Sequence, residues 1–180
     1  MNNSYKISEI KAGSQGEFRK LIDGSADDIF ALALKITADE EDARDIVQDS
    51  FIRLWEKRKT LKEKDSLLPF LKKITVNKCL DHLRKKKNHN INTASPELLN
   101  TLASSVQADS ELQNQELFSL LKSLGSGLSP KQKVVFTMVE LEQMSHDEVA
   151  NITGMTKNSI KSNLRHAKRR LEEYVRYYLK

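Results

Sequence analysis

The chain has 180 residues, a length sufficient for one domain or two small ones. Its formal net charge is +5, and 38% of its residues are hydrophobic. No apolar run approaches the roughly 20 residues that a membrane span requires, and the start carries no signal-peptide pattern. We therefore expect a cytoplasmic protein without membrane insertion. The lone cysteine, Cys79, excludes an internal disulfide and a cysteine-based zinc site.

Charge is distributed unevenly along the chain. Residues 61–90 hold nine basic and three acidic side chains, and residues 129–180 hold ten basic and six acidic ones. Residues 1–60 and 91–128 are net acidic. Two separate basic blocks indicate two contacts with a polyanion such as DNA. Solvated helix faces would give the same charge distribution, so other features must distinguish them from contacts with DNA.

The few glycines and prolines, six and three, together with helical spacing of apolar residues, predict an all-α protein. In the stretch DARDIVQDSFIRLW, residues 42–55, one face is apolar. A second face at spacings i, i+3, i+4 and i+7 is acidic yet contains an isoleucine, and it consists of Asp45, Gln48, Asp49 and Ile52. This combination is unusual for a solvated helix and predicts a docking face for a basic partner.

A basic helix is predicted further along, in FLKKITVNKCLDHLRKKK at residues 70–87. Lys73, Asn77 and Arg84 share one face of it, and the opposite side is apolar. On its own, such a pattern is typical of a solvent-exposed helix face without a binding role. With a second basic helix about eighty residues later, it predicts a bipartite DNA contact.

Between Lys87 and Lys122 the chain has no lysine or arginine, and its first part is polar and interrupted by Pro96. A stretch of this length without structure is unusual inside a compact domain. We therefore predict two small helical domains, 1–88 and 110–180, joined by a flexible linker at 89–109.

The second domain shows the pattern of a helix-turn-helix. Ser129-Pro130 and Ser145 are helix starts, Gly154 is a helix end, and Thr156 caps a third helix. The apolar face of that helix is formed by Ile160, Leu164, Ala167, Leu171 and Val175. Its other face is basic and polar, as expected for a helix that enters the major groove. A helical hairpin with a solvated basic face is the structural alternative.

These motifs resemble the bacterial sigma factors of the extracytoplasmic-function group, the smallest sigma factors of RNA polymerase. DARDIVQDSFIRLW is similar to the second conserved region of the family. FLKKITVNKCLDHLRKKK is similar to its minus-ten-reading helix, and LSPKQKVVF together with the third helix to its fourth region. The resemblance covers residues 16–175 in the expected order.

The resemblance implies a role for each candidate residue. The face of Asp45, Gln48, Asp49 and Ile52 would bind the β′ clamp helices of the polymerase core. Lys73, Asn77 and Arg84 would handle the minus-ten element, where a base leaves the stack. The second domain would sit on the β subunit flap. The third helix would read the minus-thirty-five element with Thr156, Lys157, Asn158, Lys161, Ser162, Arg165, Lys168 and Arg169.

The predicted function is accordingly promoter-specific initiation with RNA polymerase core and promoter DNA as partners, and an anti-sigma factor is a further candidate partner. A stand-alone helix-turn-helix regulator is the alternative, although it would not need the docking face. An enzyme would need the acidic run at 39–45 as metal ligands or as an acid/base pair. No histidine accompanies that run, and acids are common at helix starts. We expect no enzymatic activity, cofactor or metal.

Overall fold

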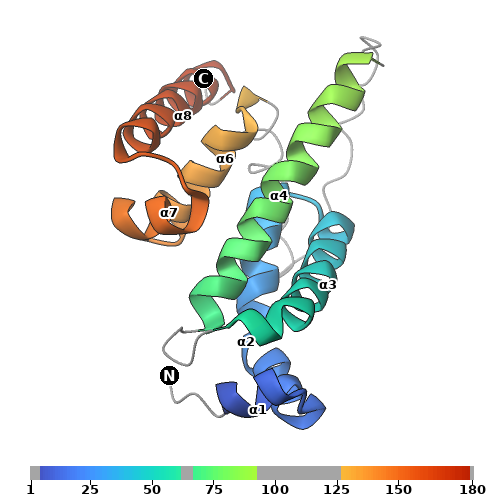
Figure 1. Ribbon diagram of the computed structural model, residues 1–180. Coiled ribbons are helices and arrows are strands. Elements are labelled where there is room, and N and C mark those ends of the chain that lie inside the picture. Colours follow the sequence, from blue (N-terminus) through green and yellow to red (C-terminus); the bar gives the residue numbers. More distant parts are fainter. Residues whose placement is uncertain (1–4, 62–66, 93–126, 179–180) are drawn as a thin grey trace, which may run out of the picture.

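The computed structural model describes residues 5–61, 67–92 and 127–178, without the side chains of 88–92, 174, 175, 177 and 178. Every regular element in these ranges is helical, which confirms the predicted all-α class (Figure 1). In the same ranges, no helix combines the length and apolar character needed to cross a bilayer.

The N-terminal part is built from helices of very different lengths. They are α1 (Ile7–Ala12), α2 (Gln15–Thr37), α3 (Glu40–Lys57), the short 3-10 helix η1 (Arg58–Thr60) and α4 (Leu67–Asn92). Helix α4 thus runs four residues past the boundary predicted at residue 88. The remainder of the predicted linker lies outside the described residues.

The C-terminal part follows the predicted succession of helices. They are α6 (Pro130–Phe136), a π-helical turn η4 (Thr137–Leu141), α7 (His146–Thr153) and α8 (Lys157–Tyr178). Ser129 and Ser145 both form complete capping boxes, with Gln132 and Glu148 respectively. These reciprocal bonds satisfy amide groups that a helix start leaves unpaired, so the local chemistry of the sequence explains where α6 and α7 begin.

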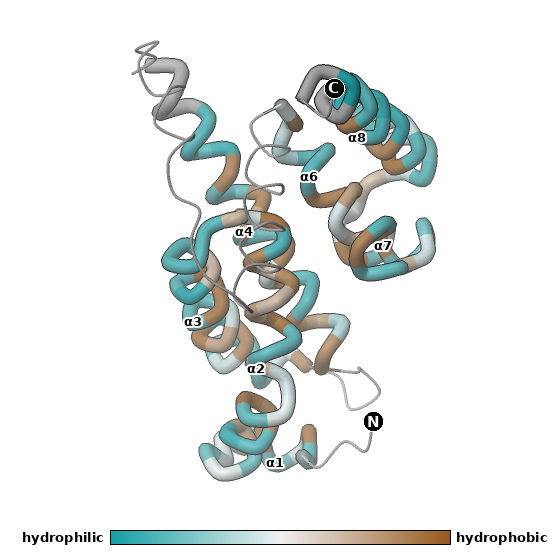
Figure 2. The backbone as a smooth tube through the Cα atoms, turned by 180° about the vertical axis from the view of Figure 1, so that it is seen from behind, coloured by the Kyte–Doolittle hydropathy of each residue, from teal (hydrophilic) through white to brown (hydrophobic). Residues whose placement is uncertain are grey.

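Buried apolar side chains of the described residues form two clusters. The smaller one joins α1, the first two-thirds of α2, the end of α3 and the start of α4 around Leu21, Leu54 and Leu71. The larger cluster contains residues of α2, α3 and α4 together with Val134, Met138 and others from the C-terminal helices. Figure 2 shows hydrophobic segments on α4 and on the C-terminal helices α6 and α7. The two parts therefore share a core, which the sequence did not predict.

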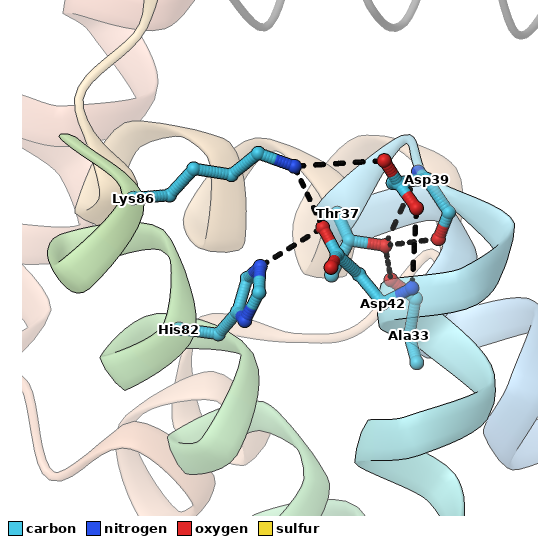
Figure 3. A network of polar contacts seen from close by, with 6 residues as sticks. All are labelled: Ala33, Thr37, Asp39, Asp42, His82 and Lys86. Carbon is cyan, nitrogen blue, oxygen red and sulfur yellow. Dashed lines mark hydrogen bonds and ion pairs between the residues drawn. The ribbon is translucent and has the colours of Figure 1, made fainter. Parts of the chain in front are cut away.

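A polar network fixes the corner between α2 and α3 against α4 (Figure 3). Asp39 caps α3 by accepting from the Asp42 amide at 3.1 Å, and the Thr37 hydroxyl donates to the Ala33 carbonyl at 3.0 Å. From α4, Lys86 Nζ lies 2.8 Å and His82 Nε2 lies 2.9 Å from an Asp42 carboxylate oxygen. The Asp42 carboxylate raises the pKa of Lys86 by its hydrogen bond. Asp39 and Asp42 at this helix start are thus engaged in capping and in tying α4 to α3.

Candidate functional site

Helix α3 presents the predicted docking face to solvent. Its apolar stripe is directed inward, with Ala43 and Leu54 fully buried. Asp45, Gln48 and Asp49 are exposed, and Ile52 is 49% exposed, the only large hydrophobic residue so exposed among those described. A half-exposed isoleucine beside acidic side chains gives this face both an apolar anchor and negative charge.

Beside this face an apolar groove of about 550 Å³ runs between α2 and α3. We call it the docking groove, and it is lined by Gln15, Phe18, Arg19, Ile22, Gln48, Phe51, Ile52 and Trp55. The Phe18 and Trp55 ring centroids are 4.8 Å apart, in a tilted arrangement. Packed aromatic rings give the groove a firm floor, suited to a protruding apolar side chain of another protein.

The structure places four residues of α2 in the groove beside the predicted docking face. Gln15, Phe18, Arg19 and Ile22 precede the motif of α3 by twenty positions or more. Their i, i+3, i+4 and i+7 spacing indicates that they share one helix face. Only the packing of α2 on α3 shows that this face lies beside the predicted docking face.

One predicted docking residue also contacts the candidate DNA-reading helix. Lys78 Nζ of α4 lies 2.7 Å from Asp49 Oδ2 of α3. The Asp49 side chain remains 62% exposed, so this pair leaves it accessible. The pair connects the docking face to α4.

On α4 the three predicted minus-ten residues are all exposed and share one face. Lys73, Asn77 and Arg84 point away from the buried Leu71 and Cys79. Arg84 lies 3.1 Å from Asp81, one turn earlier on the same helix. An exposed amide flanked by cations can hydrogen-bond to an unpaired base while the cations meet phosphates.

The helix-turn-helix prediction is confirmed in its local geometry. Gly154 ends α7 in the left-handed conformation at φ 72°, where a side chain is unfavourable. Thr156 caps α8 by accepting from the Ser159 amide at 3.2 Å. Ile160 and Ala167 are fully buried, Leu164 and Leu171 are half-buried, and Val175 lies outside the described side chains.

All eight predicted minus-thirty-five residues lie between Thr156, which precedes α8, and Arg169, just past the middle of that helix, and all are exposed. Three of them form ion pairs within the chain: Lys157 with Asp147 at 2.6 Å, Lys168 with Glu140 at 2.9 Å and Arg169 with Glu173 at 3.6 Å. For Asn158, Lys161, Ser162 and Arg165 the described contacts include no ion pair.

Groups of acidic, histidine and cysteine side chains fit to hold a metal ion do not occur among the described residues. Two residues of the acidic run at the start of α3 have structural contacts: Asp39 caps the helix, and Asp42 contacts His82 and Lys86.

A helix-turn-helix with an exposed basic helix, a second basic helix and an apolar docking groove together define a DNA-binding protein that also docks to another protein. Family models agree with this class. The model described as sigma-70 region 2 matches residues 21–89, and the sigma-70 region 4 model matches residues 120–171. The chain belongs to the sigma-70 family of RNA polymerase sigma factors, within the extracytoplasmic-function group.

Individual relatives are similar over most of the chain. The probable RNA polymerase sigma factor RfaY of Xanthomonas campestris is 25% identical over 91% of this chain, which spans 42% of that relative. The RNA polymerase sigma-E factor of Streptomyces coelicolor is 29% identical, with 87% of this chain and 85% of the relative covered. The solved structure of RpoE bound to the anti-sigma factor NepR, from Bartonella quintana, matches with a TM-score of 0.63 at 21% identity, covering 88% of this chain and 96% of the other.

Proposed function

We propose that this protein binds RNA polymerase core through the docking groove and directs transcription initiation at specific promoters. The observation that carries the proposal is the coexistence of three exposed surfaces in one chain. The docking groove is apolar, whereas the faces of α4 and α8 are basic and polar. The protein acts by binding and positioning, and catalysis remains with the polymerase.

The proposed partner of the docking groove is a helical segment of the β′ subunit. Ile52 and the aromatic floor of the groove would bury an apolar side chain, and Asp45 and Asp49 at its edge would pair with basic residues of the partner. Apolar anchors in the centre of an interface dominate affinity, while charges at the rim steer association.

The two basic helices have complementary proposed roles on promoter DNA. Helix α8 would enter the major groove at the minus-thirty-five element with Asn158, Lys161 and Arg165 near base edges. Helix α4 would act at the minus-ten element, where Asn77 can bind a base that has left the stack. In this proposal the minus-thirty-five element is recognised as duplex DNA and the minus-ten element as an opened strand. Strand opening would therefore be part of promoter recognition.

An anti-sigma factor is a proposed additional partner. RpoE of Bartonella quintana, which is similar in fold, was solved in complex with the anti-sigma factor NepR. Because the docking groove and α8 are both open to solvent in the free chain, a regulator that covers either of them would prevent initiation.

Transcription in vitro with purified core polymerase on a library of promoters tests the proposal. We expect a subset of promoters to be transcribed only when the protein is present. Replacement of Asp45, Gln48 and Asp49 by alanine should spare folding and sharply weaken co-purification with core. A stand-alone helix-turn-helix regulator would instead bind DNA without retaining core polymerase, and that result would overturn the proposal.

A further inference from the structure

Acidic side chains of α3 meet basic side chains of α4 where these two helices pack. Lys86 and His82 of α4 both contact Asp42 at the start of α3 (Figure 3). Further along α3, Asp49 meets Lys78, with 2.7 Å between Asp49 Oδ2 and Lys78 Nζ. The partners follow each other in opposite order along the two helices. These contacts therefore form one row between antiparallel helices.

The two ends of this row differ in exposure. The Asp42 side chain is only 22% exposed and has two partners on α4. The Asp49 side chain is 62% exposed and has one partner, Lys78. The contacts of Asp42 therefore tie α4 to α3, whereas Asp49 is open to a second cation that arrives from solvent.

Asp49 also belongs to the predicted docking face. In the proposed complex, a basic residue of core polymerase approaches the same carboxylate that Lys78 contacts. The incoming cation neutralises Asp49 and repels the Lys78 ammonium. Both effects become stronger when the interface excludes water, because buried charges are screened less. Docking at Asp49 therefore weakens the attraction that holds Lys78 against α3.

Lys78 is well placed to contact DNA once its ammonium is free. It directly follows Asn77, so the two residues are about 100° apart around the helix axis. The flexible stem of a lysine can turn its point charge toward a phosphate. Asp81, which is the only acidic residue of α4, already contacts Arg84 at 3.1 Å. A released Lys78 ammonium therefore meets no unengaged carboxylate on its own helix.

From these observations we propose that Lys78 is a further promoter-contacting residue, and that Asp49 holds its ammonium against α3 until core polymerase engages Asp49. Lys78 then turns toward a phosphate beside the base that Asn77 binds. Asp49 acts through Lys78 and is a positioning residue in this step. The inference rests on the proposed function, because it requires docking at Asp49 and DNA along α4. It adds Lys78 to the predicted minus-ten residues.

Binding of the full-length free chain to a fluorescent single-stranded oligothymidylate at low ionic strength tests the holding role of Asp49. Asp49→Asn should raise the affinity roughly two- to fivefold, because it releases Lys78. It should also steepen the slope of log affinity against log salt by about 0.7, as expected for one more phosphate contact on a single strand. In a Lys78→Met chain the same substitution should change little. Binding through α8 is common to all variants and cancels in this comparison.

Asp45→Asn is the matched control for this experiment. It removes one negative charge from the same exposed face, and the described contacts give Asp45 no ion pair. Its effect on affinity should be smaller than that of Asp49→Asn and should not depend on Lys78. An equal gain from both substitutions, or a gain from Asp49→Asn that persists without Lys78, would overturn the inference. Circular dichroism would confirm that each variant is folded.

The holoenzyme tests the DNA contact itself, on a template mispaired at the minus-ten element. Lys78→Met should reduce the salt dependence of binding by about one phosphate contact, and Lys78→Arg should retain it. At saturating core polymerase, Asp49→Asn should no longer alter the affinity for DNA, because Asp49 is already engaged. Lys20→Met, which removes the partner of Glu17 within α2, should leave the salt dependence unchanged. An unchanged salt dependence in the Lys78→Met holoenzyme would overturn the inference.

Affinity for core polymerase separates this inference from the proposed function. A chain that directs transcription, but in which the effect of Asp49→Asn on free-chain DNA binding is independent of Lys78, would contradict the inference and leave the function intact. A wild-type chain that neither binds core polymerase nor supports transcription would refute the proposed function, and the inference with it.

Discussion

The docking groove and the recognition helix α8 are both exposed, but they are assembled in different ways. The groove is apolar and combines side chains of α2 and α3, so it exists only when those helices pack. The face of α8 is polar and basic, and all its members lie within one helix and its cap. A surface formed by one helix can be predicted from the periodicity of the sequence. A surface formed by two helices is recognised only when the structure shows how they pack.

The largest expected effect comes from placing a charge in the docking groove. Ile52→Asp should lower affinity for core polymerase by about 2 kcal/mol or more, roughly thirtyfold, because a desolvated carboxylate replaces an apolar anchor. The midpoint of thermal unfolding should change little, since Ile52 is already 49% exposed. Fluorescence titration with core measures the affinity, and Glu40→Gln on the same helix is the control. Wild-type affinity in the Ile52 variant would place the interface elsewhere.

An alteration of α8 should affect promoter choice and leave core binding unchanged. Arg165→Ala should weaken the holoenzyme–promoter complex by about 1–3 kcal/mol and relax base preference at one position, if the side chain pairs with a base edge. Arg169→Ala should weaken all sequences alike and reduce the salt dependence by about one phosphate contact. Binding to randomised minus-thirty-five elements measures both. A uniform loss in both variants would contradict base reading by Arg165.

Helix α4 offers an intermediate test, because it contacts the N-terminal core while its outer face is free to meet DNA. Asn77→Ala should slow strand opening several-fold, as expected for loss of about 1 kcal/mol of hydrogen bonding, and leave closed complexes nearly intact. A template mispaired at the minus-ten element should restore transcription. Arg84→Ala should weaken closed and open complexes together. Permanganate footprinting resolves the two steps, and an Asn77 variant that opens duplex promoters at the wild-type rate would exclude this residue from melting.

The smallest effect is expected from Lys168→Ala, at less than about 1 kcal/mol in promoter affinity. Its ammonium already pairs with Glu140, so less of its charge is free for phosphate than that of Arg165. Salt-dependent binding measurements compare the two arginine variants with this one. A loss as large as that of Arg169→Ala would mean that Lys168 leaves Glu140 on DNA.

Local chemistry made much of this structure predictable. The helix starts at Ser129 and Ser145 and the stop at Gly154 depend on groups within three or four residues, and the exposed face of α3 follows from its period. The contribution of Phe18 and Ile22 to the groove was not predicted, because it depends on how α2 packs.

The packing of the two parts against each other was not predicted for a related reason. Val134 and Val76 are apolar residues that any helical core could use. Only the structure shows that these two belong to one cluster across the predicted domain boundary. The roles of individual side chains on DNA and core remain predictions.

Burial of Cys79 has a consequence for how signals reach this protein. Oxidants attack the thiolate form of cysteine, and a thiol with a pKa of about 12 is almost entirely protonated at neutral pH. Peroxide should therefore leave the mass of the folded chain unchanged at this residue. The folded chain therefore cannot detect oxidants through its only cysteine. Another molecule would have to detect an oxidant before the signal altered transcription.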